Sequence, residues 1–311
     1  MQNLVQNNLV LNIKGWAELS RIPFHLVGIA PMIVGTIWAR QSASIINWEL
    51  ASAAILAVIL IMLATYYAGE YFDQKEDILS SKYWKSNFAG GSKTLQKGII
   101  NPSNVLKAAN ISAILAIILG IFIQFYFKTG YWTIPLGAFG LLAGYFYSVP
   151  PMRWVKRGIG ELLIGLSYGY LPVFVSYYIQ TNSFNPVLFI IASPIAISIF
   201  LVIFINEFPD NKADMETRKA NLVVRLGINK SALIYIIGNI LFIISIFYIL
   251  LNNLVKKNMP LYFPVLLSMI LALFIVLGFH KKPKTLEPVC ALTILLNLST
   301  NIILIISSFN D

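Results

Sequence analysis

Charged residues are scarce in this 311-residue sequence, and cysteine is almost absent. Lys, Arg, Asp and Glu together make up 12% of the chain, whereas soluble globular domains carry roughly 25%. So small a charged fraction excludes a water-facing surface over most of the chain. The single cysteine, Cys290, excludes a disulfide framework and a cysteine-based metal site.

Hydrophobic residues instead make up 58% of the chain, and the mean hydropathy is +0.74. Apolar segments of the length that crosses a bilayer, roughly 20 residues, recur along the whole sequence. We predict an all-α fold, a polytopic membrane bundle of about nine transmembrane helices that forms one domain over residues 1–311. The polar segment 1–15 lacks a basic stretch followed by an apolar run, so no cleaved signal peptide is expected. The helices are expected near residues 22–40, 49–71, 104–127, 130–148, 158–180, 186–207, 230–251, 261–279 and 288–308.

The basic residues are distributed unevenly among the loops that these helices define. When the N-terminus is placed inside and the loops alternate, all but four of the 23 Lys and Arg residues fall on the inner side. This asymmetry follows the positive-inside rule and predicts a multi-pass protein of the cell (plasma) membrane, with its N-terminus and its active site facing the cytoplasm. It also accounts for the net charge of +10, because the cations lie in short loops between membrane spans. We therefore expect membrane lipid, and no nucleic acid, as a partner. The four exceptions are Arg40, Lys128, Lys256 and Lys257.

Eight of the 13 acidic residues gather in two short segments at the ends of the second and sixth predicted helices. Within each segment three acids share one spacing, i, i+3 and i+7, which places three side chains on one face of a helix. The two sets are offset by 137 residues, and Pro209 predicts a helix break within the second. The first cluster is Glu70, Asp73 and Asp77, and the second is Glu207, Asp210 and Asp214.

Three carboxylates on one helix face repel one another, and proximity to a membrane adds a desolvation cost. A divalent cation removes this repulsion. Oxygen ligands without histidine or cysteine suit magnesium, which takes one or two carboxylates and completes its shell with water and substrate phosphate. Nearby Lys and Arg side chains can pair with phosphate oxygens. The clusters therefore predict a site for magnesium and a diphosphate; the alternative is a solvated loop with ordinary surface acids.

Four segments of the sequence resemble the UbiA superfamily of membrane prenyltransferases, most closely the branch that prenylates 1,4-dihydroxy-2-naphthoate. YYAGEYFDQKED (66–77) is similar to the family's first aspartate motif, and INEFPDNKADMETRKANLVVRLG (205–227) is similar to the second. GGSKTLQKGIINP (90–102) and YSVPPMRWVKRGIGELLIGLSYGYLP (147–172) resemble further family blocks. One departure stands out: Gly69 replaces the leading Asn of the first motif, and Glu70 replaces the Asp that follows it. A side-chain ligand is therefore missing at position 69.

The resemblance implies an enzyme that uses Mg²⁺ to bind a prenyl diphosphate, ionises its allylic C–O bond and lets a small aromatic acceptor attack the resulting cation. The implied metal ligands and catalytic residues are Asp73 and Asp77 for one ion and Asp210 and Asp214 for another, with Glu70 and Asn206 in support. Basic residues that match the family blocks are implied to hold the diphosphate oxygens; their alternative role is anchoring at the inner membrane face. These residues are Lys93, Arg153, Lys156 and Lys219.

Three functions remain open at this point. The first is prenyl transfer to a quinone precursor, with 1,4-dihydroxy-2-naphthoate of menaquinone biosynthesis as the acceptor that the motifs favour. The second is the same transfer to another acceptor, such as 4-hydroxybenzoate, homogentisate, a tetrapyrrole or a glycerol-phosphate ether lipid. The third is a metal-dependent transporter. Transporters place polar groups near the middle of the bilayer, whereas the acids here lie at helix ends.

Overall fold

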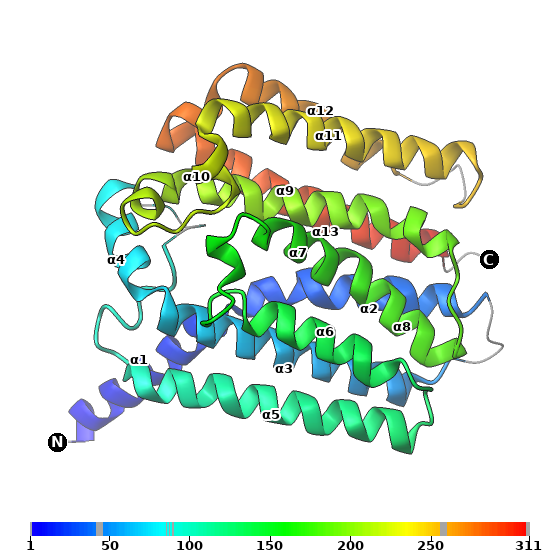
Figure 1. The fold of residues 1–311 in the computed structure, drawn as a ribbon, viewed down its shortest axis with the longest axis horizontal. Helices are drawn as coiled ribbons and strands as arrows, with labels where there is room; N and C mark the ends of the chain where they lie inside the picture. Colours follow the sequence, from blue (N-terminus) through cyan, green and yellow to red (C-terminus); the bar gives the residue numbers. More distant parts are fainter. Residues whose placement is uncertain are drawn as a thin grey trace.

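The computed structural model describes residues 2–41, 46–84, 86, 88, 90–255 and 260–308, and the regular structure in these ranges is entirely helical. Most helices run along one long axis and form a single elongated bundle (Figure 1). The elements are α1 (Gln2–Leu19), α2 (Leu26–Ala39), α3 (Trp48–Phe72), α4 (Gln74–Tyr83), α5 (Pro102–Tyr126), α6 (Thr133–Tyr145), α7 (Gly160–Gly165), α8 (Leu171–Thr181), α9 (Val187–Glu216), α10 (Leu222–Leu226), α11 (Ile228–Leu251), α12 (Tyr262–Val276) and α13 (Pro283–Ser308).

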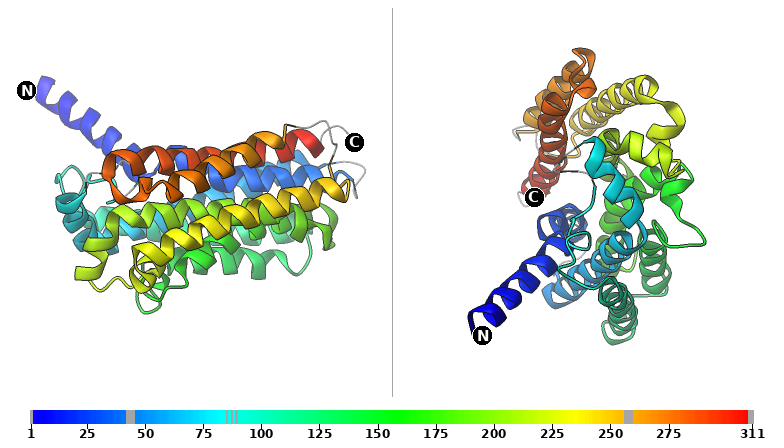
Figure 2. Two further views of the ribbon diagram at one scale, coloured as in Figure 1. Left: turned by 90° about the horizontal axis from the view of Figure 1, so that it is seen from above. Right: turned by 90° about the vertical axis from the view of Figure 1, so that its left-hand side faces the viewer.

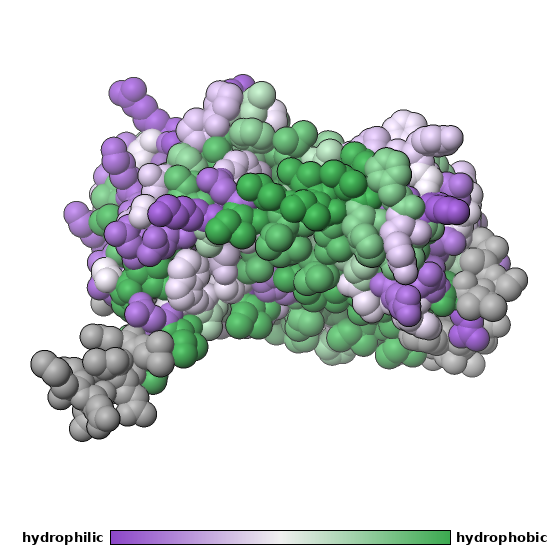
Figure 3. Space-filling view, turned by 90° about the horizontal axis from the view of Figure 1, so that it is seen from below, coloured by the Kyte–Doolittle hydropathy of each residue, from purple (hydrophilic) through white to green (hydrophobic). Residues whose placement is uncertain are grey.

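Seven helical segments in the described ranges are long and apolar enough to cross a membrane, and α6 and α12 are two shorter apolar helices. Together they occupy the nine segments that the sequence predicted, so the prediction of an all-α polytopic bundle is confirmed. The predicted break between the third and fourth segments is also present: α5 ends at Tyr126, α6 begins at Thr133, and Gly130 between them has φ of +92°. On the face shown in Figure 3, apolar residues cover the middle of the bundle and polar residues gather toward both ends.

Several boundaries differ from the prediction. α6 ends at Tyr145 and α12 at Val276, and each end comes about three residues before the predicted one. Gly278, with φ of +82°, follows the end of α12. The predicted helix 158–180 is one helical run from Gly160 to Thr181, but its middle turn, Leu166–Tyr170, is a π-helix. Such a turn holds one extra residue, and here it directly precedes Pro172 at the start of α8.

The helix with the second acidic cluster contradicts the predicted break at Pro209. α9 continues without interruption through Pro209 to Glu216. Proline has no N–H, so it leaves the carbonyl of Ile205, four residues earlier, without its helical donor. The Cys290 thiol of α13 lies 4.0 Å from that oxygen and serves as a weak donor. The neighbouring helix therefore supplies what the proline removes.

The break lies in the first cluster instead. α3 ends at Phe72 and α4 begins at Gln74, with Asp73 between them in a non-helical conformation (φ −102°, ψ 14°). The chain therefore turns at the residue that carries the middle carboxylate. The two clusters share one spacing, but the second lies on a continuous helix and the first spans a helix junction.

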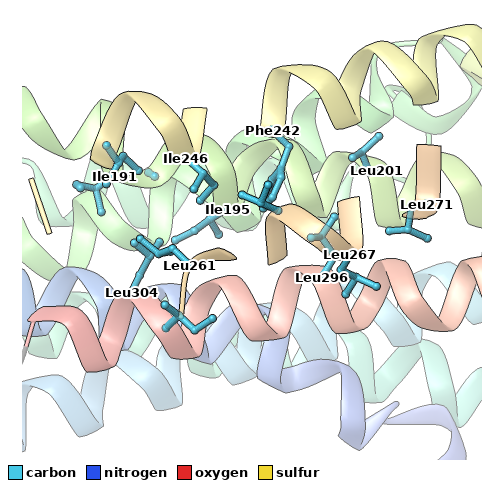
Figure 4. Close-up of a cluster of buried hydrophobic side chains, with 14 of the residues drawn as sticks. Ile191, Ile195, Leu201, Phe242, Ile246, Leu261, Leu267, Leu271, Leu296 and Leu304 are labelled. Atoms are coloured by element: carbon cyan, nitrogen blue, oxygen red, sulfur yellow. The ribbon is translucent and has the colours of Figure 1, made fainter. Parts of the chain in front are cut away.

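The largest apolar core lies between α9, α11, α12 and α13, and α2 and α8 pack against it. Figure 4 shows Ile191, Ile195, Phe242 and Leu296 pointing into this core from three of these helices. On the other side of the bundle, α3 packs along α5 and α6. α4 and α10 lie at the end of the bundle where α1 enters (Figure 1). α1 itself leaves the bundle obliquely at that end (Figure 2).

Close packing of α2 on α8 depends on one glycine and gives a first prediction. A Cβ at Gly35 would overlap the Val173 carbonyl oxygen and the Ser176 hydroxyl, both on α8. We expect Gly35→Ala to lower the free energy of unfolding by about 1–3 kcal/mol, the usual cost of an overpacked core. Gly120→Ala is the matched control, because its Cβ meets no atom within 4 Å; it should raise stability slightly, since alanine favours helix. Thermal unfolding in detergent measures both, and equal midpoints for the two variants would contradict the packing argument.

Candidate active site

Five of the six clustered acids, all but Glu70, line one cavity of about 760 Å³ at the end of the bundle where α4, α10 and α1 lie. α3 contributes Gly69, its junction with α4 contributes Asp73, and α4 contributes Asp77; α9 contributes Asn206, Glu207, Asp210 and Asp214. Two predicted phosphate-binding residues, Lys93 and Lys219, line the same cavity. The common offset of 137 residues thus corresponds to two helices that present their acids to one space.

Asp73 is held by the segment that follows α6. Its Oδ2 accepts a hydrogen bond from the Ser148 hydroxyl at 2.5 Å, and its Oδ1 pairs with Arg153 at 2.9 Å. The same guanidinium lies 3.6 Å from Glu76, which also pairs with Lys156 at 2.8 Å. Arg153 therefore holds Asp73 of the first cluster, Lys156 holds the neighbouring Glu76, and neither base is among the residues that line the cavity. Their predicted contact with a diphosphate stays a prediction.

Glu70 is buried and fully engaged, with 1% of its surface exposed. Arg21 pairs with its Oε1 at 2.8 Å, and Ser92 donates its backbone N–H at 2.9 Å and its hydroxyl at 2.9 Å. The carboxylate thus connects the start of the first membrane segment to the loop that follows α4. The structure gives Glu70 these protein partners, and its predicted role as a metal ligand is untested.

Glycines let the loop after α4 approach the carboxylates closely. Gly91 has φ of +65°, and a Cβ there would overlap the carboxylate of Asp77. The backbone N–H of Gly90 lies 3.4 Å from Asp210, which also accepts a short hydrogen bond from the Ser80 hydroxyl of α4. The GGSK loop therefore contacts both clusters through its backbone, as glycine-rich segments do where a main chain must approach an anionic site.

Asp214 and Lys219 form the second charged centre of the cavity. Asp214 accepts a hydrogen bond from Asn221 at 2.7 Å, and the Lys219 ammonium lies 3.7 Å away. Burial raises the pKa of Asp214 to about 7, although Lys219 opposes the shift. Burial alone would lower the pKa of Lys219, but the surrounding carboxylates, Asp214 first, raise it well above its usual value. Lys219 is therefore a cation in a site that favours positive charge.

The donor set fits a hard cation such as magnesium. The Oδ1 atom of Asn206 is buried without a hydrogen-bond partner in the described part of the chain, and it lines the same cavity as Asp210 and Asp214. All of these donors are oxygen atoms, as magnesium prefers. No three Asp, Glu, His or Cys side chains in the described ranges lie close enough to hold a metal ion directly. A bound ion would therefore replace some of the protein donors that now hold these carboxylates.

Sequence reasoning missed the contribution of residues 14–21 to the cavity. Lys14, Glu18 and Arg21 line the cavity, and Glu18 accepts a hydrogen bond from Thr94 at 3.1 Å. Arg21 has φ of +47° and lies 5.7 Å from the ring of Tyr66. These contacts join residues 45 to 76 positions apart, and no local pattern in the sequence indicates them.

A second, apolar cavity adjoins the first deeper in the bundle. Its volume is about 100 Å³, and its walls come from α2, α3, α5, α6 and the Gly160–Thr181 segment. Thr65 and Tyr168 line both cavities, so the polar chamber and the apolar one share a wall. Four of the residues that line the apolar cavity are glycines of α5 and α6, which have no side chain to fill it: Gly120, Gly137, Gly140 and Gly144.

Two acid-bearing helices around one chamber, inside a polytopic helical bundle, define a class of membrane protein with a polar chamber at one end of the bundle. The comparison with known families then identifies it. The model of the UbiA prenyltransferase family matches residues 28–299, and the chain belongs to this family. The resemblance noted in the sequence is thereby confirmed.

Individual relatives agree with this assignment. The chain is 26% identical over 210 residues to 1,4-dihydroxy-2-naphthoate octaprenyltransferase of Bacillus subtilis, an alignment that covers 68% of this chain and 65% of the relative. It is 24% identical over 215 residues to 2-carboxy-1,4-naphthoquinone phytyltransferase of Synechocystis, covering 69% and 66%. The alignments thus span about two thirds of the length of these relatives. A UbiA homologue from Archaeoglobus fulgidus, solved with GPP and Mg²⁺, has the same fold (TM-score 0.61, 14% identity, 94% of this chain and 99% of that one).

Proposed function

We propose that the protein transfers a prenyl chain from a prenyl diphosphate to an aromatic quinone precursor, and that 1,4-dihydroxy-2-naphthoate is the acceptor. The observation that carries the proposal is the pair of adjoining cavities: a polar chamber lined by both acidic clusters, and an apolar cavity behind it. A molecule with a charged diphosphate head and a hydrocarbon tail fits this pair of environments. The B. subtilis relative named above supports the choice of acceptor.

The head of the substrate is placed by the residues of the polar chamber. Asp73, Asp77, Asp210 and Asp214 would hold magnesium with the Asn206 oxygen, and magnesium would neutralise charge on the leaving diphosphate. Lys219 and Lys93 supply further positive charge at the chamber wall. Placed in advance around the leaving group, these charges lower the barrier to breaking the allylic C–O bond.

The tail of the substrate passes Thr65 and Tyr168 into the apolar cavity, so the allylic carbon lies at the shared wall. The C–O bond breaks with its electron pair on the diphosphate, and a ring carbon of the acceptor forms the new C–C bond. That ring carbon then loses a proton if it carried hydrogen, or carbon dioxide if it carried a carboxylate, and the ring becomes aromatic again. Aromatic residues near the shared wall, Tyr66 and Tyr168, present π faces that favour a nearby cation.

The direct test is product analysis with purified protein in detergent. The protein is incubated with Mg²⁺, a labelled prenyl diphosphate and one of three acceptors: 1,4-dihydroxy-2-naphthoate, 4-hydroxybenzoate or homogentisate. We expect a prenylated naphthoate product by mass spectrometry, and none after metal removal with EDTA. Transfer to another acceptor would replace the proposed acceptor. No transfer by well-folded protein, together with uptake of the diphosphate into liposomes, would favour the transporter instead.

Magnesium is expected to stabilise the protein more at pH 8 than at pH 6. The folded-state pKa of Asp214 is raised from 3.8 to about 7, so this group's contribution to stability is present below pH 4 and is lost as the pH rises through 7. At pH 8 Asp214 is ionised and adds to the negative charge of the chamber, and a divalent ion relieves the resulting repulsion. The thermal midpoint is measured at each pH with about 5 mM MgCl₂, to saturate the site, and again with EDTA, to remove the metal. An equal magnesium effect at both pH values would contradict the proposed site.

The orientation of the bundle is part of the proposal. We place the protein in the cell membrane with the polar chamber on the cytoplasmic side, because the loops at that end carry most of the Lys and Arg residues. A soluble prenyl diphosphate precursor would then reach the chamber directly from the cytoplasm. Cysteine labelling of Lys14→Cys in intact and permeabilised cells tests this placement, since only permeabilised cells should be labelled by an impermeant reagent.

A further inference from the structure

Glu207 is a buried carboxyl group to which no N–H or O–H group of the described residues donates. Only 7% of its surface is exposed, and neither of its carboxylate oxygens has a hydrogen-bond partner in the described part of the chain. Its counterpart 137 residues earlier, Glu70, pairs with Arg21 and accepts two hydrogen bonds from Ser92. The two acids occupy equivalent positions in their motifs, yet only one of them is satisfied by the protein.

The unpartnered carboxyl faces the polar chamber. Glu207 lines the chamber together with Ile203, Asp210 and Asp214, which follow one face of α9. At about 1.5 Å of rise per residue, Glu207 lies about 4.5 Å deeper along the helix than Asp210. The order along α9 is therefore two aspartates near the mouth, then Glu207, then an apolar residue at the level of the shared wall. Glu207 is thus placed beyond the diphosphate and beside the allylic carbon.

One neighbour of Glu207 is another acid, Glu161, and the two carboxyl groups are close enough to share a hydrogen bond. One shared proton satisfies one oxygen of each acid, so one oxygen of Glu207 still lacks a donor. Glu161, whose Oε1 accepts the Leu222 N–H at 2.5 Å, has a second oxygen that is also buried and to which no N–H group of the described residues donates. Lys219 is the nearby cation, and its ion pair is with Asp214. Tyr147 also lines the chamber. Its ring lies against Gly160, where a Cβ would come within 2.9 Å of a ring carbon. A ligand with a flat ring and a hydrogen-bond donor would fit here, because it could donate to Glu207 and pack against the ring of Tyr147.

We infer that Glu207 accepts a hydrogen bond from a hydroxyl group of the aromatic acceptor and so determines which ring carbon faces the allylic carbon. This inference rests on the proposed function and deepens it. A diphosphate oxygen has no hydrogen to donate to Glu207, and a hydrocarbon tail would leave it without a donor. A phenolic or naphtholic hydroxyl is the part of the two substrates that can donate to it.

The test is a graded pair of substitutions assayed for initial rates. Glu207→Gln keeps a neutral acceptor of the same shape, and Glu207→Met removes hydrogen bonding at similar length. Because the glutamine oxygen can still accept a hydrogen bond and methionine cannot, we expect the KM for the acceptor to rise about 10-fold in the first variant and about 100-fold in the second. The KM for the prenyl diphosphate and the half-saturating Mg²⁺ concentration should change less than about 2-fold. Glu49→Gln, an exposed acid at the other end of α3, is the matched control.

Two further readouts separate this role from a structural one. Loss of an unpartnered buried carboxyl should leave the thermal midpoint unchanged or raised, whereas a structural glutamate would lower it when replaced. An acceptor analogue with its hydroxyl methylated should react poorly with the wild-type protein and no worse with the Glu207→Met variant, because the interaction is then already lost.

An unchanged acceptor KM in both variants would overturn the inference. A shift in the Mg²⁺ dependence with a constant acceptor KM would also overturn it, since it would make Glu207 a metal ligand. These outcomes differ from failure of the proposed function, which would show as absence of prenyl transfer by the wild-type protein itself.

Discussion

Replacement of Asp73 or Asp210 by asparagine is expected to lower the rate of prenyl transfer by about 100- to 1000-fold while the bundle stays folded. Each substitution removes one negative charge from a chamber whose proposed task is to gather metal around a diphosphate. The amide keeps one oxygen in place, so the hydrogen bonds from Ser148 and Ser80 can persist. The lost charge, and not lost packing, should therefore dominate the effect.

The measurement is the initial rate of product formation at saturating substrates over a range of Mg²⁺ concentrations. Thermal midpoints and gel-filtration profiles of each variant report on folding. Glu49→Gln provides the control for loss of one carboxylate far from the chamber. Normal turnover in both aspartate variants would exclude the two-cluster metal site, and a loss in only one would assign the metal to that cluster.

Gly91→Ala should reduce transfer by about 100-fold through displacement of a single carboxylate. A methyl group at this position overlaps the Asp77 side chain, so either the carboxylate or the loop must move. Gly91 also has φ of +65°, where any L-residue with a Cβ is strained by roughly 1–2 kcal/mol. The activity loss must therefore be separated from the cost of backbone strain.

Gly98→Ala makes that separation possible. Gly98 lies in the same connection between α4 and α5 and has nearly the same backbone angle, φ of +66°, but its Cβ would meet no atom within 4 Å. Both variants should lose similar stability, measured by thermal unfolding. Only Gly91→Ala should lose most of its transfer rate. Equal rates in the two variants would show that Asp77 tolerates displacement or takes no part in the reaction.

The helices of this protein were predictable because their signal is local. A long apolar run identifies a membrane helix whatever it packs against, and all nine predicted segments are helical. The shared i, i+3, i+7 spacing likewise indicated that the two acidic clusters belong to one site. Both clusters do line one cavity.

The details of the site depended on contacts that no local pattern shows. Pro209 gave a reasonable expectation of a helix break, but α9 continues through it, and the thiol of Cys290, 85 residues after Ile205, lies beside the freed Ile205 carbonyl. The actual break, at Asp73, has neither proline nor glycine to mark it. Glu70 looked like a metal ligand because its spacing matches the aspartates, yet Arg21 and Ser92 reach it from both directions along the chain.

The position of α1 has a practical consequence for experiments on this protein. Its last turns, with Lys14, Ala17 and Glu18, form part of the chamber wall, and the N-terminus lies at the chamber end of the bundle while α13 ends at the opposite one (Figure 1). A purification tag or reporter fused ahead of α1 therefore adds bulk beside the substrate entrance, whereas the same fusion after α13 is separated from it by the length of the bundle. Lower turnover of the N-terminal fusion than of the C-terminal fusion would show that bulk ahead of α1 hinders access to the chamber.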